Sequence, residues 1–290
     1  MDWFSLTLLS AFSYATADTV TKRYLSHYRP GEMVLVRFGA TGIILLPLLL
    51  LQPWPGLTLA FWGWMAALLP LEILAMWLYM RAIRESALSL TLPYLAFTPA
   101  FNVLTGYVLL GETVTWTGFS GISLVVCGAW LLNLDVARNG HRLDIMAPFR
   151  AIAREPGARL MLGVAALYSL TSVLGKGALQ YVPPGFFGPF YFVLLGVVTA
   201  LLFASREVKP WQVLGRHPWA HLGAGVFMGV MVVTHFYALP QVEVAYMIAV
   251  KRTSLLFGIL YGAWLFDETG LKKNLLAGVL MVLGVFLIVE

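Results

Sequence analysis

Residues 33–51, with the sequence MVLVRFGATGIILLPLLLL, form a long apolar run that carries a single charge, Arg37. An α-helix rises about 1.5 Å per residue, so a helical run of this length crosses a bilayer core of about 30 Å. Similar runs recur along the whole chain. They lie at about 3–21, 33–51, 58–80, 87–110, 115–134, 160–179, 185–204, 218–239, 243–266 and 271–289.

The composition agrees with a membrane protein. The chain of 290 residues is 60% hydrophobic and 11% charged, with a mean hydropathy of +0.81. A soluble domain cannot hide that much apolar surface, whereas lipid accepts it. The first run lacks a basic start and a clear cleavage site, so we expect a span rather than a signal peptide. Backbone groups in lipid must be satisfied within each segment, which predicts an all-α membrane protein.

The loops between the runs differ in charge according to their order along the chain. Even-numbered loops hold no Lys or Arg, whereas odd-numbered loops hold most of the 19 basic residues. Cytoplasmic loops collect basic residues, so the odd loops are predicted to be cytoplasmic and both termini non-cytoplasmic. We expect a multi-pass protein of the inner (plasma) membrane. The net charge of +5 belongs to these loops and does not indicate a nucleic-acid partner.

The two halves of the chain match at an offset of about 154–156 residues. Tyr14 and Lys22 fall on Tyr168 and Lys176, and Gly128 falls on Gly284. Each half then holds five predicted helices, and because five is odd the second half must be inverted. The fold class predicted is therefore ten transmembrane helices as two inverted five-helix repeats, 1–134 and 160–290. Such repeats bind substrate near the midplane between the halves.

The segment between the halves, 135–159, is the only long predicted loop, and it is basic. Its apolar and basic residues follow a helical pattern that is broken once, at Pro148. Two interpretations stay open: a short helix in the cytoplasmic interface, or a solvated basic connector.

The repeats carry Gly111-Glu112-Thr113 and Asp267-Glu268-Thr269 at equivalent positions between the fourth and fifth helices. With the ten-helix pattern, this motif resembles the EamA branch of the drug/metabolite transporter superfamily over nearly the whole chain. The resemblance implies secondary transport of a small solute without ATP, and it does not fix the solute. Members are often drawn with cytoplasmic termini, and here the loop charges argue otherwise.

Lys251 and Arg252 lie about eight residues into the ninth predicted helix, where an unpaired charge costs roughly 2.5–3.5 kcal/mol on insertion scales. No acid lies within one turn, which indicates an anion from solution. Asp18 or Glu72 from another helix is the alternative partner. The pair also resembles the Lys-Arg pair in the ninth helix of plastid sugar-phosphate translocators. The resemblance implies that this pair binds phosphate, as it does in those translocators.

Other ionisable and hydroxyl residues are weaker candidates. Lys22 and Lys176 would assist an anion from opposite sides, although Lys22 could equally contact headgroups or pair with Asp18. Glu72 is either a proton-coupling carboxylate or an ion-pair partner. His235 fits a wall residue better than a proton relay. Arg37, Tyr79 and Tyr246 are expected to pair or to line the site.

Smaller features concern packing. Cys127 is predicted to be a buried packing residue, and Pro93 and Pro99 are predicted to bend the fourth helix. Two glycine pairs should permit close helix contacts, Gly118 with Gly121 and Gly225 with Gly229. The sequence contains no Walker loop and no metal-ligand spacing, so neither an enzyme nor a metal or other cofactor is expected.

Three functional hypotheses remain. The first is alternating-access transport of a small anion bearing phosphate or carboxylate, coupled to protons or to a counter-substrate. The second is export of amino acids or related metabolites. The third is movement of a lipid or polyprenyl-phosphate headgroup between leaflets. The expected partners are a small-molecule substrate and the lipid bilayer, and a monomer suffices.

Overall fold

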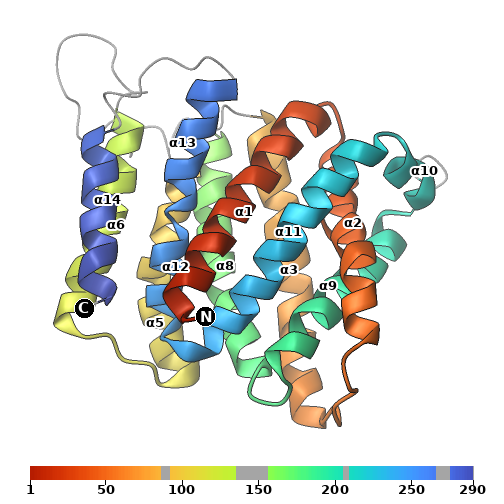
Figure 1. Cartoon of the computed structure of the whole chain (residues 1–290), viewed down its shortest axis with the longest axis horizontal. Coiled ribbons are helices and arrows are strands. Elements are labelled where there is room, and N and C mark those ends of the chain that lie inside the picture. The colour runs from red at the N-terminus through yellow and green to blue at the C-terminus, as the bar shows by residue number, and fades with distance from the viewer. Residues whose placement is uncertain (86–91, 135–155, 205–208, 266–274, 290) are drawn as a thin grey trace.

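The computed structural model describes residues 1–85, 92–134, 156–204, 209–265 and 275–289, and all regular structure in these ranges is helical. Figure 1 shows the helices packed as one bundle, with both marked chain ends at the same end. The elements are α1 (Trp3–Leu25), α2 (Pro30–Leu50), α3 (Leu59–Glu85), η1 (Leu92–Phe97), α5 (Thr98–Leu110), α6 (Trp116–Leu134), α8 (Pro156–Ala178), α9 (Pro184–Phe203), α10 (Pro210–Gly215), α11 (Pro218–Ala238), η2 (Leu239–Gln241), α12 (Val244–Lys251), α13 (Ser254–Leu265) and α14 (Leu275–Val289).

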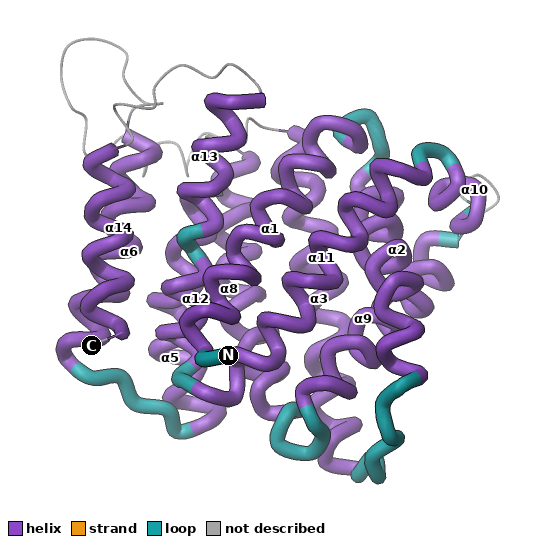
Figure 2. Tube along the Cα trace, viewed as in Figure 1, coloured by secondary structure: helices purple, strands orange, loops and turns teal. Residues whose placement is uncertain are grey.

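The helices have the length and composition of membrane spans. Among the described residues, α2, α3, α8, α9 and α11 are long and apolar enough to cross a bilayer. Shorter apolar helices cover Tyr94–Leu110, Trp116–Leu131 and Ala277–Val289. Figure 2 shows most of the described loops at the two ends of the bundle. The prediction of an all-α, multi-pass membrane protein is confirmed for the part of the chain described.

Two of the apolar runs are broken rather than continuous. The fourth run changes from the 3-10 helix η1 to α5 at Phe97 and Thr98. Pro99 stands in the first turn of α5, where its missing N–H leaves no bond unmade. The ninth run is interrupted at Arg252 and Thr253, between α12 and α13. Pro93 and Pro99 predicted the first break, whereas no proline or glycine indicated the second.

The second break is a tight turn closed by short-range backbone bonds. Thr253 N donates to Val250 O at 3.0 Å, and Leu255 N donates to Arg252 O at 2.9 Å. These i→i+3 bonds locally replace the α-helical pattern. The turn places Lys251 and Arg252 at the end of a half-helix inside the bundle.

Small residues allow several helices to approach closely, as predicted. A Cβ added at Gly121 would lie 2.6 Å from Gly284 O, and one added at Gly128 would lie 2.7 Å from Ala277 O. These contacts join α6 to α14, the pair of neighbours seen side by side in Figure 1. Gly225 of α11 also lies close to α2, where its Cβ would be 2.6 Å from Ile44 Cδ1 and 3.2 Å from Ala40 C.

Cys127 is a correction to the sequence analysis. The prediction of a buried packing residue is wrong, because the thiol is exposed. It lines a groove beside α5 that also contains Val103, Leu104 and Phe119. An apolar run does not by itself distinguish a lipid-facing position from a buried one, since both environments accept the same side chains.

Two connections differ from the sequence estimate. The helix predicted to begin at about 160 begins at Pro156, a residue that favours the first helical turn. A short helix, α10, was not predicted; Arg216 Nη1 next to it bonds Glu32 Oε1 of α2 at 2.6 Å. Residues 135–155, on which the linker hypotheses depend, lie outside the described ranges.

We predict that Gly284→Ala destabilises the protein by about 1–3 kcal/mol, because the new methyl group would sit 2.5 Å from Gly121 O, a backbone atom. Gly163→Ala is the matched control, since nothing lies within 4 Å of its added Cβ. The measurement is thermal unfolding in detergent. Equal losses in the two variants would contradict the close crossing.

Candidate functional site

A cleft between the two halves encloses about 680 Å³ of empty space, counting its open side. Its walls come from α1, α3, α8, α9, α11 and α12. The lining is Tyr14, Leu68, Glu72, Met76, Tyr168, Thr171, Ser172, Gly175, Tyr191, Phe192, Met228, Met231, Val232, His235, Phe236, Ile248, Lys251 and Arg252. Charged groups therefore share one space with aromatic rings and methionine thioethers.

Lys251 is buried at the end of α12, with 8% of its surface exposed. Its Nζ contacts His235 Nδ1 at 3.1 Å and donates to Met231 Sδ at 3.2 Å. The ammonium also lies 5.6 Å from the centroid of the Tyr14 ring. These partners are neutral, so they hydrogen-bond the ammonium without cancelling its charge.

Arg252 follows directly and is 6% exposed, and its Nε has no hydrogen-bond partner. Among the described residues, neither Lys251 nor Arg252 makes a salt bridge within 4.0 Å. Neither cation is therefore in a direct salt bridge with Asp18 or Glu72, although Glu72 lines the same cleft. Two adjacent buried cations without a direct salt bridge form an electrostatic arrangement suited to a ligand.

Glu72 of α3 lines the same cleft and is partly exposed to it. Thr171 and Tyr191 also line it, and the Tyr191 hydroxyl is buried without a partner. Hydroxyls and a carboxylate on one wall thus face a space that also contains Lys251 and Arg252. The remaining lining is apolar and soft, as in Met76 and Met228, and such side chains adapt to ligands of different shape.

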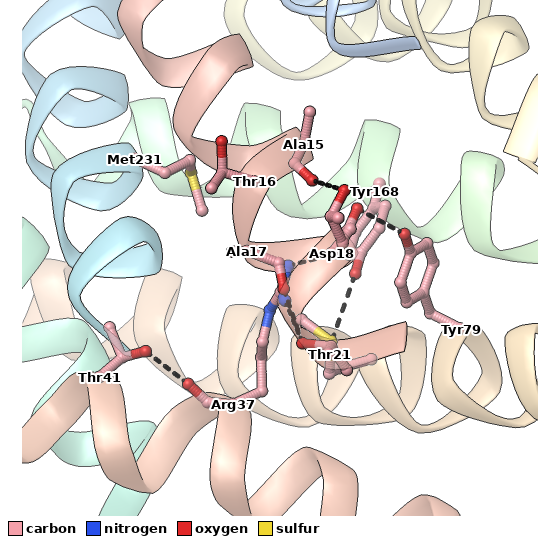
Figure 3. A network of polar contacts seen from close by, with 12 residues as sticks. Ala15, Thr16, Ala17, Asp18, Thr21, Arg37, Thr41, Tyr79, Tyr168 and Met231 are labelled. Carbon is pink, nitrogen blue, oxygen red and sulfur yellow. Dashed lines mark hydrogen bonds and ion pairs between the residues drawn. The ribbon is translucent and has the colours of Figure 1, made fainter. Parts of the chain in front are cut away.

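A largely buried ion-pair network lies beside the cleft (Figure 3). Arg37 Nη2 of α2 bonds Asp18 Oδ1 of α1 at 2.6 Å, and Tyr79 Oη of α3 donates to Asp18 Oδ2 at 2.9 Å. Arg37 Nη1 donates to Thr21 Oγ1 at 3.0 Å. Asp18 lies one turn beyond Tyr14 on α1, so this layer borders the cleft.

A second ion pair lies next to Gly175, a residue of the cleft lining. Lys176 Nζ of α8 bonds Glu112 Oε1 at 2.5 Å and Val242 O at 2.6 Å. Glu112 Oε2 accepts the backbone N–H of Val244, at the start of α12, at 2.8 Å. Figure 1 shows α1 beginning and α8 ending at the same end of the bundle. The two ion-pair layers therefore flank the cleft from opposite sides.

The Gly-Glu dipeptide has a clear structural cause. Gly111 ends α5 with φ of 70°, a left-handed conformation that glycine adopts without strain. Gly111 N donates to Tyr107 O at 3.1 Å, which is an αL helix ending, and Glu112 N donates to Gly106 O at 3.2 Å. This ending turns the chain so that the Glu112 carboxylate reaches Lys176.

The predicted site residues divide into two groups. The structure brings Lys251, Arg252, Glu72 and His235 together around the cleft. Three others have partners elsewhere: Lys176 bonds Glu112, Tyr79 bonds Asp18, and the Tyr246 hydroxyl accepts Thr115 N at 2.7 Å. Lys22 stands in the last turn of α1, outside the cleft lining.

Several lining residues were not predicted, among them Tyr14, Met228 and Met231. Tyr14 and Tyr168 are equivalent positions of the two halves, and both line the cleft. That equivalence was the available signal, because a shared central site makes both copies face the same space. Met228 and Met231 gave no signal, since methionines in apolar runs occur throughout the chain. No group of three metal-binding side chains occurs in the described residues.

Comparison with known proteins identifies the family. The model of the EamA-like transporter family matches residues 1–134 and 155–290. The chain belongs to this family. It is therefore a member of the drug/metabolite transporter superfamily, and the resemblance seen in the sequence is confirmed. Membership in a transporter family assigns this membrane protein to small-solute transport.

Solved structures support the fold. One chain, titled "Crystal structure of protein", has a TM-score of 0.72 and 17% sequence identity, with 98% of each chain covered. At this identity the likeness concerns the fold alone. No curated protein matches the chain.

We predict that Arg37→Gln destabilises this EamA family member by about 3–5 kcal/mol, because it leaves Asp18 buried without a counter-ion. The double variant Asp18→Asn/Arg37→Gln should regain part of that loss. Arg81→Gln is the control, because its pair with Glu85 is exposed and worth about 0.2–1 kcal/mol. Thermal unfolding of the purified variants tests the order, and an Arg37→Gln variant as stable as the control would contradict it.

Proposed function

We propose that this protein is a secondary active transporter that moves a small organic anion by alternating access, with Lys251 and Arg252 as its anion site. The anion bears phosphate or carboxylate. The main observation that supports this proposal is that two adjacent, buried cations line a central cleft and make no salt bridge within the described residues. A transporter rather than an enzyme fits a cleft whose charges sit at a helix break between two halves.

The packing supports two inverted five-helix repeats. Under the repeat offset, Gly121 and Gly128 of α6 correspond to Ala277 and Gly284 of α14. Exchanging the halves therefore converts the Gly121–Gly284 contact into the Gly128–Ala277 contact, and both occur. The extensive α1–α11 and α3–α8 contacts are exchanged in the same way. The broken runs, at Phe97 and Arg252, also occupy equivalent positions.

The anion assignment follows from charge and position. The break between α12 and α13 places Lys251 and Arg252 at mid-span, where a charge needs a partner. Their counterparts in the first half, Leu95 and Ala96, are apolar. The equivalent position in the first half packs without charged residues. The cations in the second half are therefore not needed for packing, which favours a binding role over a structural one.

Alternating access requires each end of the cleft to open in turn. The Asp18–Arg37 layer joins helices of the first half only, whereas Lys176 and Glu112 come from different halves. Rocking of one half against the other would break the second pair first, because its partners move apart. In this mechanism Lys176 and Glu112 act in gating, and Lys22 and Tyr246 lie near the ends rather than at the anion.

A second candidate substrate is favoured by Glu72. A carboxylate and two cations around one cleft match a zwitterion, with the amine at Glu72 and the carboxylate at Lys251 and Arg252. Export of amino acids or related metabolites is therefore the alternative. A lipid headgroup fits less well, because the lateral groove beside α5 shares no lining residue with the cleft.

We expect phosphate esters or carboxylates to raise the unfolding temperature of the wild type. A ligand at 100 times its dissociation constant stabilises by about 2.7 kcal/mol. The variant Lys251→Gln/Arg252→Gln should lose this response, and the exposed-site variant Arg81→Gln should keep it. The panel also includes amines and amino acids. Stabilisation by amino acids alone would select the zwitterion, and an unresponsive wild type would overturn the anion site.

The proposed topology places both termini outside the cytoplasm of an inner (plasma) membrane, with the odd loops inside. A fluorescent protein that matures only in the cytoplasm should stay dark when fused after Glu290. A periplasmic phosphatase fused there should be active. The reverse result would mean that both termini face the cytoplasm, so that each ion-pair layer faces the other side of the membrane. One chain encloses the cleft, so a monomer is sufficient.

A further inference from the structure

We propose that His235 binds a proton together with the anion, so that a doubly charged anion enters the site as an anion–proton pair. The inference rests on the proposed function, because it assigns the coupling ion of the same anion site. It begins with the contact of 3.1 Å between Lys251 Nζ and His235 Nδ1 in the buried wall of the cleft.

The contact fixes how many protons the two nitrogens can share. A lysine ammonium has donors only, so Nδ1 must be the acceptor and the imidazole must be neutral. If the amine is neutral, Nδ1–H donates to it instead. In either case one proton lies between the two nitrogens. A second proton would place two facing donors in contact, with neither hydrogen bond made.

An arriving anion removes this restriction. It offers the Lys251 ammonium an acceptor other than His235 Nδ1, and it provides an acceptor for the imidazole itself. Both cations can then donate to the anion, as charge-assisted hydrogen bonds require. The empty site therefore disfavours the second proton, and the occupied site stabilises it.

The charges of the lining determine which anions need the proton. Lys251, Arg252 and Glu72 leave the cleft with one net positive charge when His235 is neutral. A monoanion balances that charge. A dianion exceeds it, and a proton on His235 restores neutrality in a space where unbalanced charge is costly.

Other ionisable groups near this region do not replace His235. Asp18 is held by Arg37 and Tyr79, and the tyrosines are neutral near pH 7. Glu72 is the competing proton acceptor. The other titratable groups in the cleft lining are Tyr14, Glu72, Tyr168, Tyr191, Lys251 and Arg252, and the bordering network adds Asp18, Arg37 and Tyr79.

The test measures proton uptake by calorimetry in buffers of different ionisation enthalpy, none of them a phosphate or a sulfonate. Sulfate and methanesulfonate are matched probes, because both present sulfonyl oxygens, they carry two charges and one, and neither is protonated near neutral pH. We expect about one proton taken up per sulfate and about none per methanesulfonate. Above neutral pH, sulfate affinity should fall about tenfold per pH unit.

Two variants test the proton acceptor and the charge balance. His235→Asn keeps a side-chain acceptor for Lys251 but cannot be protonated, so sulfate binding should lose its proton uptake, whereas the uptake would persist in this variant if Glu72 took the proton. Glu72→Gln should also lose the uptake, because the cleft then has two net positive charges that sulfate balances without a proton. His235→Gln is the second histidine variant, used if the first does not run as a single species on size exclusion.

The outcomes separate the two proposals. Sulfate binding without proton uptake in the wild type would overturn the role of His235 and leave the anion site standing. Uptake that persists in His235→Asn would assign the proton to another group, and undiminished uptake in Glu72→Gln would overturn the charge-balance argument. Absence of binding by both anions would overturn the anion site and this inference together.

Discussion

The structure depends on one constraint: a charge inside the bundle needs a partner, because the surrounding lipid offers none. The buried network of Asp18, Arg37 and Tyr79 meets this constraint within three helices, and Lys176 meets it through Glu112. Lys251 and Arg252 do not meet it with any carboxylate in the described residues. The proposed site is therefore the layer in which the described residues supply no salt-bridge partner for the cations.

The closed layers and the open one are built from different kinds of helix. The ion pairs join side chains of continuous helices or of their ends, where geometry is fixed by packing. Lys251 and Arg252 instead stand at the turn between α12 and α13. Such a turn can change its hydrogen bonds at little cost, because the i→i+3 bonds that close it are already local. A binding site at this position can respond to its ligand without disrupting the surrounding core.

Much of the fold could be predicted from the sequence because membrane spans are local features. Apolar runs, basic loops and an internal offset each depend on residues close together, and the helix bounds agree within a few residues for most spans. The partners of the charges could not be predicted in this way. Lys176 and Glu112 are far apart in sequence, and only the crossing of α8 with the α5–α6 connection brings them together. The turn at Arg252 and the exposure of Cys127 likewise depend on tertiary packing, which apolar composition does not encode.

The same electrostatic constraint links binding to conformational change in the proposed carrier. Closing both ion-pair layers around an empty cleft confines one net positive charge away from water, from Lys251, Arg252 and Glu72. A bound monoanion, or a dianion with its proton, removes that charge and makes the closed state less costly. The ligand binds the closed state more tightly because it neutralises the unbalanced charge there. Binding and closure are then coupled locally, with no need for a signal across the protein. Substrate charge, rather than substrate shape, would therefore control exchange between the two sides, and the adaptable methionine and tyrosine lining would tolerate variation in the rest of the molecule.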